Sequence, residues 1–306
     1  MRDIESIAFL TTVAGSYPLG TLPPRRAMQR AIEDQIAAGI DLISDGQVRG
    51  DMISMFAGRI PGFRQGNDGI WEIEDALDLP HSPIAVTDYA FARSLVAERA
   101  ELKGIVTGPV TLALSCRVAA SAPYTDPGDP SLLLRLSEIL SHEVAALVAA
   151  GARVVQIDEP ALGAALAGRI SPELASDALR KLAAIPRISM LHACGDVRAS
   201  ALELLLLPFG VLHIENTRIR NLDAIDQDML DAATSRLSVG CVDTLTNDVE
   251  SVDLIFDRIS AAAQLIEGER LWISPDCGMR NLAPEVSRDK LRNMALAAQR
   301  ARVELA

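Results

Sequence analysis

Residues 189–194 read Ser-Met-Leu-His-Ala-Cys, a short apolar run that ends in a histidine and a cysteine two positions apart. Such a run is typical of a buried strand, and side chains in a strand alternate between its two faces. His192 and Cys194 are therefore expected to point to the same side. Imidazole and thiolate are ligands that zinc favours, but two ligands hold a metal weakly, so further ligands must come from other segments.

Similar apolar runs recur along the chain, and segments with helical spacing separate them, including one near residues 87–99. The expected strands are residues 7–13, 41–46, 104–110, 154–160, 189–194, 211–216, 237–243 and 271–274. Nearly continuous apolar strands that alternate with helices indicate parallel strands buried on both faces. Eight such units fit an α/β fold of the closed (β/α)8 TIM-barrel type, as a single domain over residues 1–306. The alternative is an open doubly wound sheet, but its G-x-G-x-x-G loop is absent from this sequence.

One segment departs from this alternation. Residues 61–82 contain three glycines and Trp71 and show no clear period. We expect an excursion from the barrel here, and long excursions of this kind often cover a site.

Composition excludes several classes of partner. The formal charge is −12 and the pI is near 4.8, which argues against a nucleic acid or an anionic membrane, because both attract a basic face. The opening residues 1–5 do not resemble a signal peptide, and no apolar run is long enough to span a bilayer. We therefore expect a cytoplasmic protein. The four cysteines are widely spaced, which favours free thiols over a disulfide framework.

In a barrel, functional groups lie at the carboxyl ends of the strands. Glu215 follows one expected strand and Cys277 follows another, so both can join His192 and Cys194 at the same mouth. These four side chains would complete a zinc site. His213 lies on the same strand face as Glu215, but two positions earlier, so we expect a core histidine rather than a ligand.

Two protein thiolates and a glutamate would leave the sulfur of a zinc-bound thiol substrate electron-rich, because the ligands already carry three negative charges. Such a site suits alkylation of a thiolate, because the metal lowers the pKa of whatever fills its open position. Hydrolysis by zinc hydroxide is the rival chemistry, although hydrolases more often use histidine and carboxylate ligands.

Several motifs together resemble the C-terminal catalytic barrel of cobalamin-independent methionine synthase. They occur in the family's order and cover nearly the whole chain, at residues 11–18, 107–111, 156–162, 192–194, 214–218 and 275–278. The resemblance implies a TIM barrel whose zinc is held by His192, Cys194, Glu215 and Cys277, with the sulfur of homocysteine joining the metal.

The same resemblance implies a set of substrate contacts. Ser16 and the backbone around Ala14 would hold the homocysteine carboxylate, and Asp158 would hold its ammonium group. Gln47 stands in a segment where the family carries a glutamate, which weakens one expected contact to the amine, and Gln47 is counted among the substrate-binding residues. Asp158 and Asp243 are the expected catalytic carboxylates.

Two further departures concern the methyl donor. The family's enzymes resemble two fused barrels, of which this chain has one, and Leu245 stands where the family has a histidine that helps proton delivery. A methyl group leaves the nitrogen of methyltetrahydrofolate only when that nitrogen is protonated, whereas a methyl–cobalt bond needs no proton. We therefore expect methylcobalamin or a corrinoid protein as donor.

Three alternatives to this assignment remain open. The donor could be methyltetrahydrofolate. The thiol substrate could be another thiol, such as coenzyme M. The chain could also be a non-catalytic accessory barrel that only binds zinc or a partner protein.

Overall fold

The computed structural model describes residues 4–18, 21–96 and 99–305. Residues 1–3 of the opening segment, and residues 97 and 98 of the helix expected near 87–99, therefore lie outside the described residues. In the part of the chain that is described, no helix is both long and apolar enough to cross a membrane.

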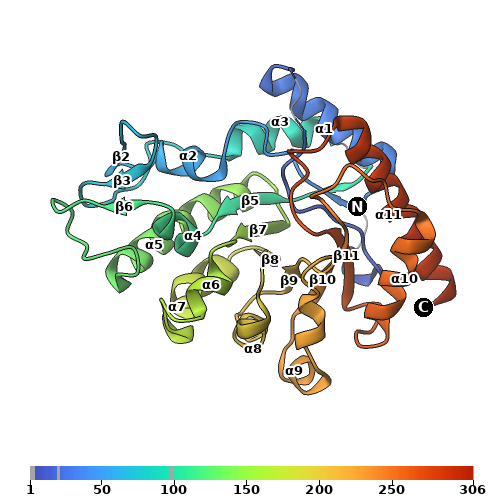
Figure 1. The fold of residues 1–306 in the computed structure, drawn as a ribbon. Helices are drawn as coiled ribbons and strands as arrows, with labels where there is room; N and C mark the ends of the chain where they lie inside the picture. Colours follow the sequence, from blue (N-terminus) through green and yellow to red (C-terminus); the bar gives the residue numbers. More distant parts are fainter. Residues whose placement is uncertain (1–3, 19–20, 97–98, 306) are drawn as a thin grey trace.

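Six parallel strands form the main sheet (Figure 1), in the spatial order β11-β10-β9-β8-β7-β5. Their side chains are buried almost throughout, as expected for strands covered on both faces. The strands are β5 (Gly104–Thr107), β7 (Val154–Asp158), β8 (Ile188–Ala193), β9 (Val211–Ile214), β10 (Arg236–Val242) and β11 (Leu271–Pro275).

Two short segments close the sheet into a barrel. Thr11 forms a parallel bridge with Ile273 of β11, and Thr12 forms one with β1 (Leu42–Ile43). Strand β1 pairs in parallel with β4 (Glu101–Leu102), which leads through Lys103 directly into β5. Eight parallel segments therefore surround one interior, which confirms the predicted TIM barrel.

The first of these segments is shorter than the sequence predicts. Residues 7–13 were expected to form a strand, but only Thr11 and Thr12 pair with neighbours. Phe9 has a φ of 49°, a left-handed conformation that interrupts an extended chain. The apolar character of residues 7–10 thus reflects burial rather than strand pairing.

Helices cover the outside of the barrel (Figure 1). The longer ones, α3 (Val86–Val96) excepted, begin with proline in the first turn or with a capping side chain, such as Asp129, Ser171 and Ser251, which accept backbone N–H groups. They are α1 (Pro24–Ala38), α3, α5 (Pro130–Ala149), α7 (Pro172–Ala183), α10 (Val252–Ala263) and α11 (Pro284–Glu304), with shorter α4 (Pro109–Leu114), α6 (Leu162–Leu166), α8 (Ala201–Leu205) and α9 (Gln227–Ala232).

The amino-terminal end of the barrel is filled with apolar side chains. Val154, Ile188 and Val211 are at the starts of their strands, and they pack with Leu10 and Trp272 in one buried cluster. Polar side chains are found instead toward the carboxyl ends of the strands. The apolar plug therefore leaves the carboxyl-end mouth as the place for a site.

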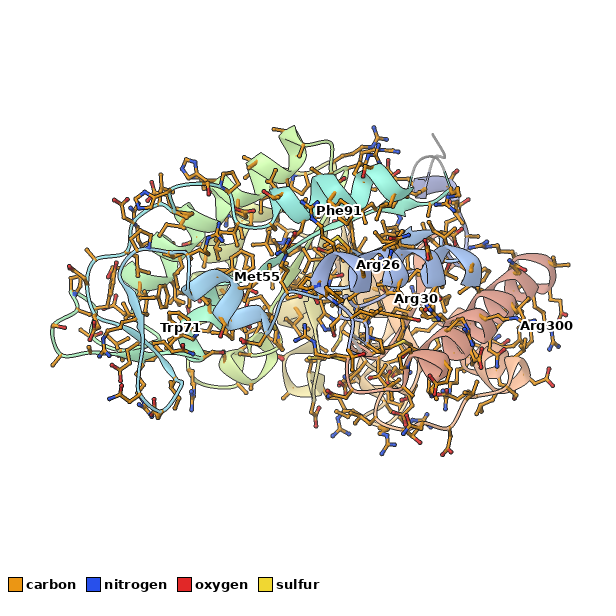
Figure 2. All side chains as sticks on the ribbon, turned by 90° about the horizontal axis from the view of Figure 1, so that it is seen from above. Arg26, Arg30, Met55, Trp71, Phe91 and Arg300 are labelled. Atoms are coloured by element: carbon orange, nitrogen blue, oxygen red, sulfur yellow. The ribbon has the colours of Figure 1, made fainter. Side chains whose placement is uncertain are left out.

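The excursion over residues 61–82 contains a hairpin. Strands β2 (Phe63–Gln65) and β3 (Trp71–Ile73) are antiparallel, and β6 (Arg117–Val118) joins β3 in parallel, which the sequence did not indicate. The hairpin lies beside α2 (Met52–Ala57), where the Trp71 indole N–H donates to the Ser54 hydroxyl at 3.0 Å. Figure 2 shows Trp71 and Met55 at this end of the molecule.

Candidate metal and substrate site

The register of the sheet brings the candidate ligands together. His192 of β8 is the register partner of His213 on β9, so the two side chains lie next to each other on the same face. Cys194 follows β8 directly, Glu215 follows β9, and Cys277 follows β11. All of these positions are at the carboxyl ends of their strands, as the sequence predicts.

Three of the four predicted ligands converge closely. The potential ligand atoms of His192, Cys194 and Cys277 all lie within 4.8 Å of one another. The Nε2 atom of His192 is 3.8 Å from the Sγ atom of Cys277. Tetrahedral zinc, with bonds of about 2.0 Å to nitrogen and about 2.3 Å to sulfur, places such atoms about 3.6 Å apart. The donor set and its spacing therefore fit zinc.

Glu215 lies beside this group rather than within it. One of its carboxylate oxygens accepts the N–H of Gly195 at 3.0 Å, which places the side chain next to Cys194. The residue is partly exposed, and burial raises the pKa of its carboxyl group, with nearby Asp276 and Cys277 adding to the effect. A cation between these groups would relieve that repulsion.

The two thiols titrate as a pair. The hydrogen bond from Cys194 lowers the pKa of the Cys277 thiol to about 4, against the effect of burial and with further help from His192. The same hydrogen bond, together with burial, raises the pKa of Cys194. A metal binds thiolates rather than thiols, so a metal that binds both sulfurs would displace the proton of Cys194.

His213 is fully buried beneath these ligands. Its Nδ1 atom is 2.8 Å from the Nδ1 atom of His192, and its Nε2 atom is 3.0 Å from the carbonyl oxygen of Pro275. Burial lowers the pKa of His213 well below its usual value, and the charges of His192 and Lys103 act in the same direction. The expected core histidine therefore contacts the metal-ligand candidate directly, which the sequence did not indicate.

Next to His192, the mouth carries a hydrogen-bonded network around Asp158, which is the register partner of His192 on the adjacent strand. Gln156 Nε2 donates to Asp158 Oδ1 and to the carbonyl oxygen of Ala14, both at 2.6 Å. Gln47 Nε2 donates to Asp158 Oδ2 at 3.1 Å. Burial raises the pKa of Asp158, while His192 and the two amide donors oppose this shift. An ammonium group arriving here would favour the ionised carboxylate.

A buried lysine supports this network from inside the barrel. Lys103 is 2% exposed, and its Nζ atom donates to Gln156 Oε1 at 2.6 Å and to Thr12 Oγ1 at 3.2 Å. Burial lowers the pKa of Lys103 to about 7, although the Asp158 carboxylate acts in the opposite direction. Sequence reasoning missed Lys103 because lysine is rarely buried unless it is paired.

Ser16 and Ala14 connect the two groups. Both line a small cavity that Cys277 also lines. A Cβ atom on Gly278 would lie 2.0 Å from the Ser16 hydroxyl oxygen, so glycine is required for this close approach. The predicted carboxylate contacts therefore lie next to a predicted metal ligand.

Asp243 lies at the end of β10, apart from the Asp158 network. Its carboxylate accepts from Arg218 Nε at 2.6 Å and from the N–H of Leu245 at 2.7 Å. The Leu245 side chain is 77% exposed.

Asp276 is a functional candidate that the sequence analysis did not select. Its carboxylate accepts the N–H groups of Asn216 and Thr217, at 2.8 and 3.1 Å, and also the Thr217 hydroxyl. These bonds fasten the turn after Glu215 to the segment that carries Cys277. The sequence could have indicated Asp276 by its position immediately before Cys277.

Comparison with known proteins gives one family. The family model described as "Cobalamin-independent synthase, Catalytic domain" matches residues 12–300. The chain is 35% identical to "Methionine synthase" of Methanothermobacter thermautotrophicus, covering 94% of this chain and 99% of the relative. It is 31% identical to "Methionine synthase" of Methanocaldococcus jannaschii, covering 95% of this chain and 98% of the relative.

More distant relatives are longer, and a solved structure has the same fold. The chain is 29% identical to "5-methyltetrahydropteroyltriglutamate–homocysteine methyltransferase" of Yersinia enterocolitica over 90% of this chain, but spans only 38% of that relative. The structure of a B12-independent methionine synthase from Shewanella sp. W3-18-1, in complex with selenomethionine, superposes with a TM-score of 0.80 at 20% identity, covering 97% of this chain and 99% of that one.

The family's description contradicts one expectation. Methylcobalamin was predicted as the donor, but the matched family is cobalamin-independent, so that prediction is wrong, and a corrinoid protein partner is not supported either. The prediction relied on two absences. The first was the single barrel, but this chain covers 99% of the Methanothermobacter thermautotrophicus relative named "Methionine synthase". The second was Leu245, which is a largely exposed side chain in a loop.

Proposed function

The chain belongs to the family of cobalamin-independent methionine synthase catalytic domains, and on that premise we propose that it methylates the thiol of homocysteine to give methionine. One observation carries this proposal: a histidine–thiol cluster and a buried carboxylate lie at the same barrel mouth. An amino acid that bears a thiol can use the first for its sulfur, through a metal, and the second for its ammonium group.

We propose that His192, Cys194 and Cys277 hold zinc, with Glu215 as the fourth protein ligand. The spacing of the first three ligand atoms supports this set, and Glu215 needs only to move from its contact with Gly195 toward the adjacent Cys194. Bound zinc would lower the pKa of the substrate thiol, so that a thiolate is available near neutral pH.

Homocysteine would be oriented by its amino and carboxyl groups. The Asp158 carboxylate would accept hydrogen bonds from the ammonium group, with the Gln47 amide beside it. Ser16 and the backbone around Ala14 would hold the carboxylate, in the cavity that Cys277 also lines. Fixing both groups at the Cα atom of the substrate directs its side-chain sulfur toward the metal ligands.

We propose an N-methylated reduced pterin of the methyltetrahydrofolate class as donor. The Yersinia enterocolitica relative is named for such a donor. The pterin nitrogen must be protonated as its methyl group leaves. We assign Asp243 to this step. Against the effect of burial, hydrogen bonds from the Leu245 N–H and from Arg218 lower the pKa of its carboxyl group, so it would stabilise the protonated nitrogen rather than supply the proton.

The proposal is tested by methionine formation with zinc-loaded protein, in cobalamin-free buffer. Homocysteine with methyltetrahydrofolate, as monoglutamate and as triglutamate, is expected to give methionine. Coenzyme M, which lacks an ammonium group, serves as the control thiol and is expected to react far more slowly. Absence of methionine from both folate forms, with zinc and homocysteine bound, would contradict the donor. Failure to bind any thiol in the presence of zinc would contradict the methyltransferase itself.

A further inference from the structure

The ring of His213 occupies a position between two ligand-bearing segments. It contacts His192 on β8 and the carbonyl oxygen of Pro275, two residues before Cys277. The two imidazole ring centroids are 4.5 Å apart and the rings are tilted by 32°. Because β8 and β9 pair in register at these two residues, the contact follows from the sheet itself rather than from a flexible loop.

The hydrogen-bond partners determine which ring nitrogens carry protons. A carbonyl oxygen can only accept, so the Nε2 atom of His213 must donate to Pro275. The other partner of His213 is a second imidazole, and neither partner compensates a positive charge on a fully buried ring. A neutral His213 that donates through Nε2 must accept through Nδ1.

The same reasoning then passes to His192. Its Nδ1 atom is 2.8 Å from the accepting Nδ1 atom of His213, so it must donate. With a proton fixed on Nδ1, His192 can offer a metal only its Nε2 atom, which faces Cys277 at 3.8 Å. Histidine ligands generally donate their second ring N–H to an acceptor, which fixes the tautomer and the ring orientation.

We infer that His213 is a positioning residue. It donates to the Pro275 carbonyl through Nε2 and therefore accepts the Nδ1–H of His192 through its own Nδ1. This relay of hydrogen bonds leaves the Nε2 atom of His192 free for the metal. The inference rests on the proposed zinc site and adds a role for a residue that is not itself a ligand. It also explains why a polar side chain is fully buried at this level of the barrel, with both ring nitrogens hydrogen-bonded.

Three substitutions of His213 separate this role from simple packing. His213→Leu removes both hydrogen bonds. His213→Asn places an oxygen where Nδ1 was, so it can still accept from His192, although it cannot reach Pro275. His213→Gln can still donate to the Pro275 carbonyl, but it has no acceptor at the Nδ1 position.

Zinc affinity is measured for each variant by competition with a chelator. His213→Leu and His213→Gln are expected to bind zinc about 10- to 100-fold more weakly than the wild type, as is typical when the partner of a ligating histidine is removed. His213→Asn is expected to recover most of that loss. Thermal unfolding of the zinc-free variants reports packing separately. Equal zinc affinity in all three variants, or a loss that follows thermal stability alone, would overturn the inference.

A spectroscopic measurement on the wild type does not depend on how the variants fold. Long-range proton–nitrogen NMR spectra of the 15N-histidine-labelled protein, with and without zinc, report which ring nitrogens are protonated. We expect a proton on Nδ1 of His192 and on Nε2 of His213 in both states, and a zinc-induced shift at Nε2 of His192. A proton on Nδ1 of His213, or zinc on Nδ1 of His192, would refute the relay while the methyltransferase proposal stands. Failure of the wild type to bind zinc, with the expected tautomers present, would instead refute the zinc site.

Discussion

Gln47, Gln156 and Asp158 are hydrogen-bonded to one another in one part of the barrel mouth, whereas the neighbouring His192, Cys194 and Cys277 bring their ligand atoms within 4.8 Å of one another. We call the first group the amine side and the second, with Glu215, the thiol side. The amine side donates and accepts within itself and is anchored from below by Lys103. The thiol side points several lone pairs at one another.

This difference indicates how each side meets its ligand. A satisfied network keeps its shape before a ligand arrives, because moving one member leaves a buried polar group unpaired. Converging lone pairs repel one another and are stabilised by a cation. The amine side therefore acts as a preformed recognition surface, and the thiol side is completed by binding a metal.

The largest effect is expected from the thiol side. Cys277→Ser replaces a thiolate with a hydroxyl group, a poor zinc ligand. Zinc affinity should fall by more than the 10- to 100-fold typical of losing a ligand's hydrogen-bond partner, and methionine formation should be lost with it. Chelator competition measures this affinity. Cys116→Ala, at a buried thiol away from the mouth, is the control and should keep full zinc stoichiometry. Unchanged zinc binding in Cys277→Ser would remove Cys277 from the ligand set.

Asp158→Asn tests the amine side. The substitution removes the charge and turns the new amide N–H2 group toward one of the two donors, Gln47 or Gln156. A hydrogen bond to a charged group contributes about 2 kcal/mol, so kcat/KM for homocysteine should fall about 30-fold. Zinc affinity should stay within a few-fold of the wild type. The preference for homocysteine over its analogue without the amino group should also decrease, and an unchanged preference would contradict the assignment of Asp158 to the ammonium group.

Asp276→Ala tests whether the thiol side depends on its supporting turn. The change removes the acceptor of the Asn216 and Thr217 N–H groups, so the turn that positions Glu215 should loosen. We expect about a 10-fold loss of zinc affinity. Thr217→Val, which removes only the hydroxyl donor, should lose less. Isothermal titration with zinc compares the two, and the opposite order of effects would show that the turn does not orient Glu215.

Gln47→Asn gives the smallest expected effect. Asparagine tolerates the φ of 44° at this position, but it is one methylene too short to keep the 3.1 Å bond to Asp158. Losing one such bond costs about 1 kcal/mol, so KM for homocysteine should rise about fivefold with little change in kcat. Steady-state kinetics with varied homocysteine measure both constants. A fall in kcat at constant KM would place Gln47 with the donor instead.

The sequence predicted those parts of the molecule that depend on local periodicity. Apolar strands that alternate with helices are enough to predict the barrel, and alternation within a strand is enough to place His192 and Cys194 on one face. Phe9 shows the limit, because its left-handed backbone shortens the first strand although the residues around it are apolar. Strand β6 was missed since its two residues become a strand only by pairing with a distant hairpin.

The rest of the site depends on the register between neighbouring strands and on how deeply a side chain is buried in the barrel. No single segment of the sequence determines either of these. The contact between His192 and His213 requires that β8 and β9 pair at these residues. The burial of Lys103 depends on the interruption between β4 and β5. There, the backbone N–H of Lys103 donates to the carbonyl oxygen of Ile43. The donor prediction from Leu245 failed for a different reason, because the absence of a histidine at one exposed loop position does not determine which donor binds.

The central claim is that the thiol side holds one zinc ion that accepts the substrate sulfur. Zinc-edge X-ray absorption of the zinc-loaded protein, before and after adding homocysteine, tests it most directly. We predict two sulfur and two nitrogen or oxygen ligands at first, with zinc–sulfur distances of about 2.3 Å, and one additional sulfur ligand after homocysteine binds. An unchanged sulfur count in the presence of saturating homocysteine would contradict the account.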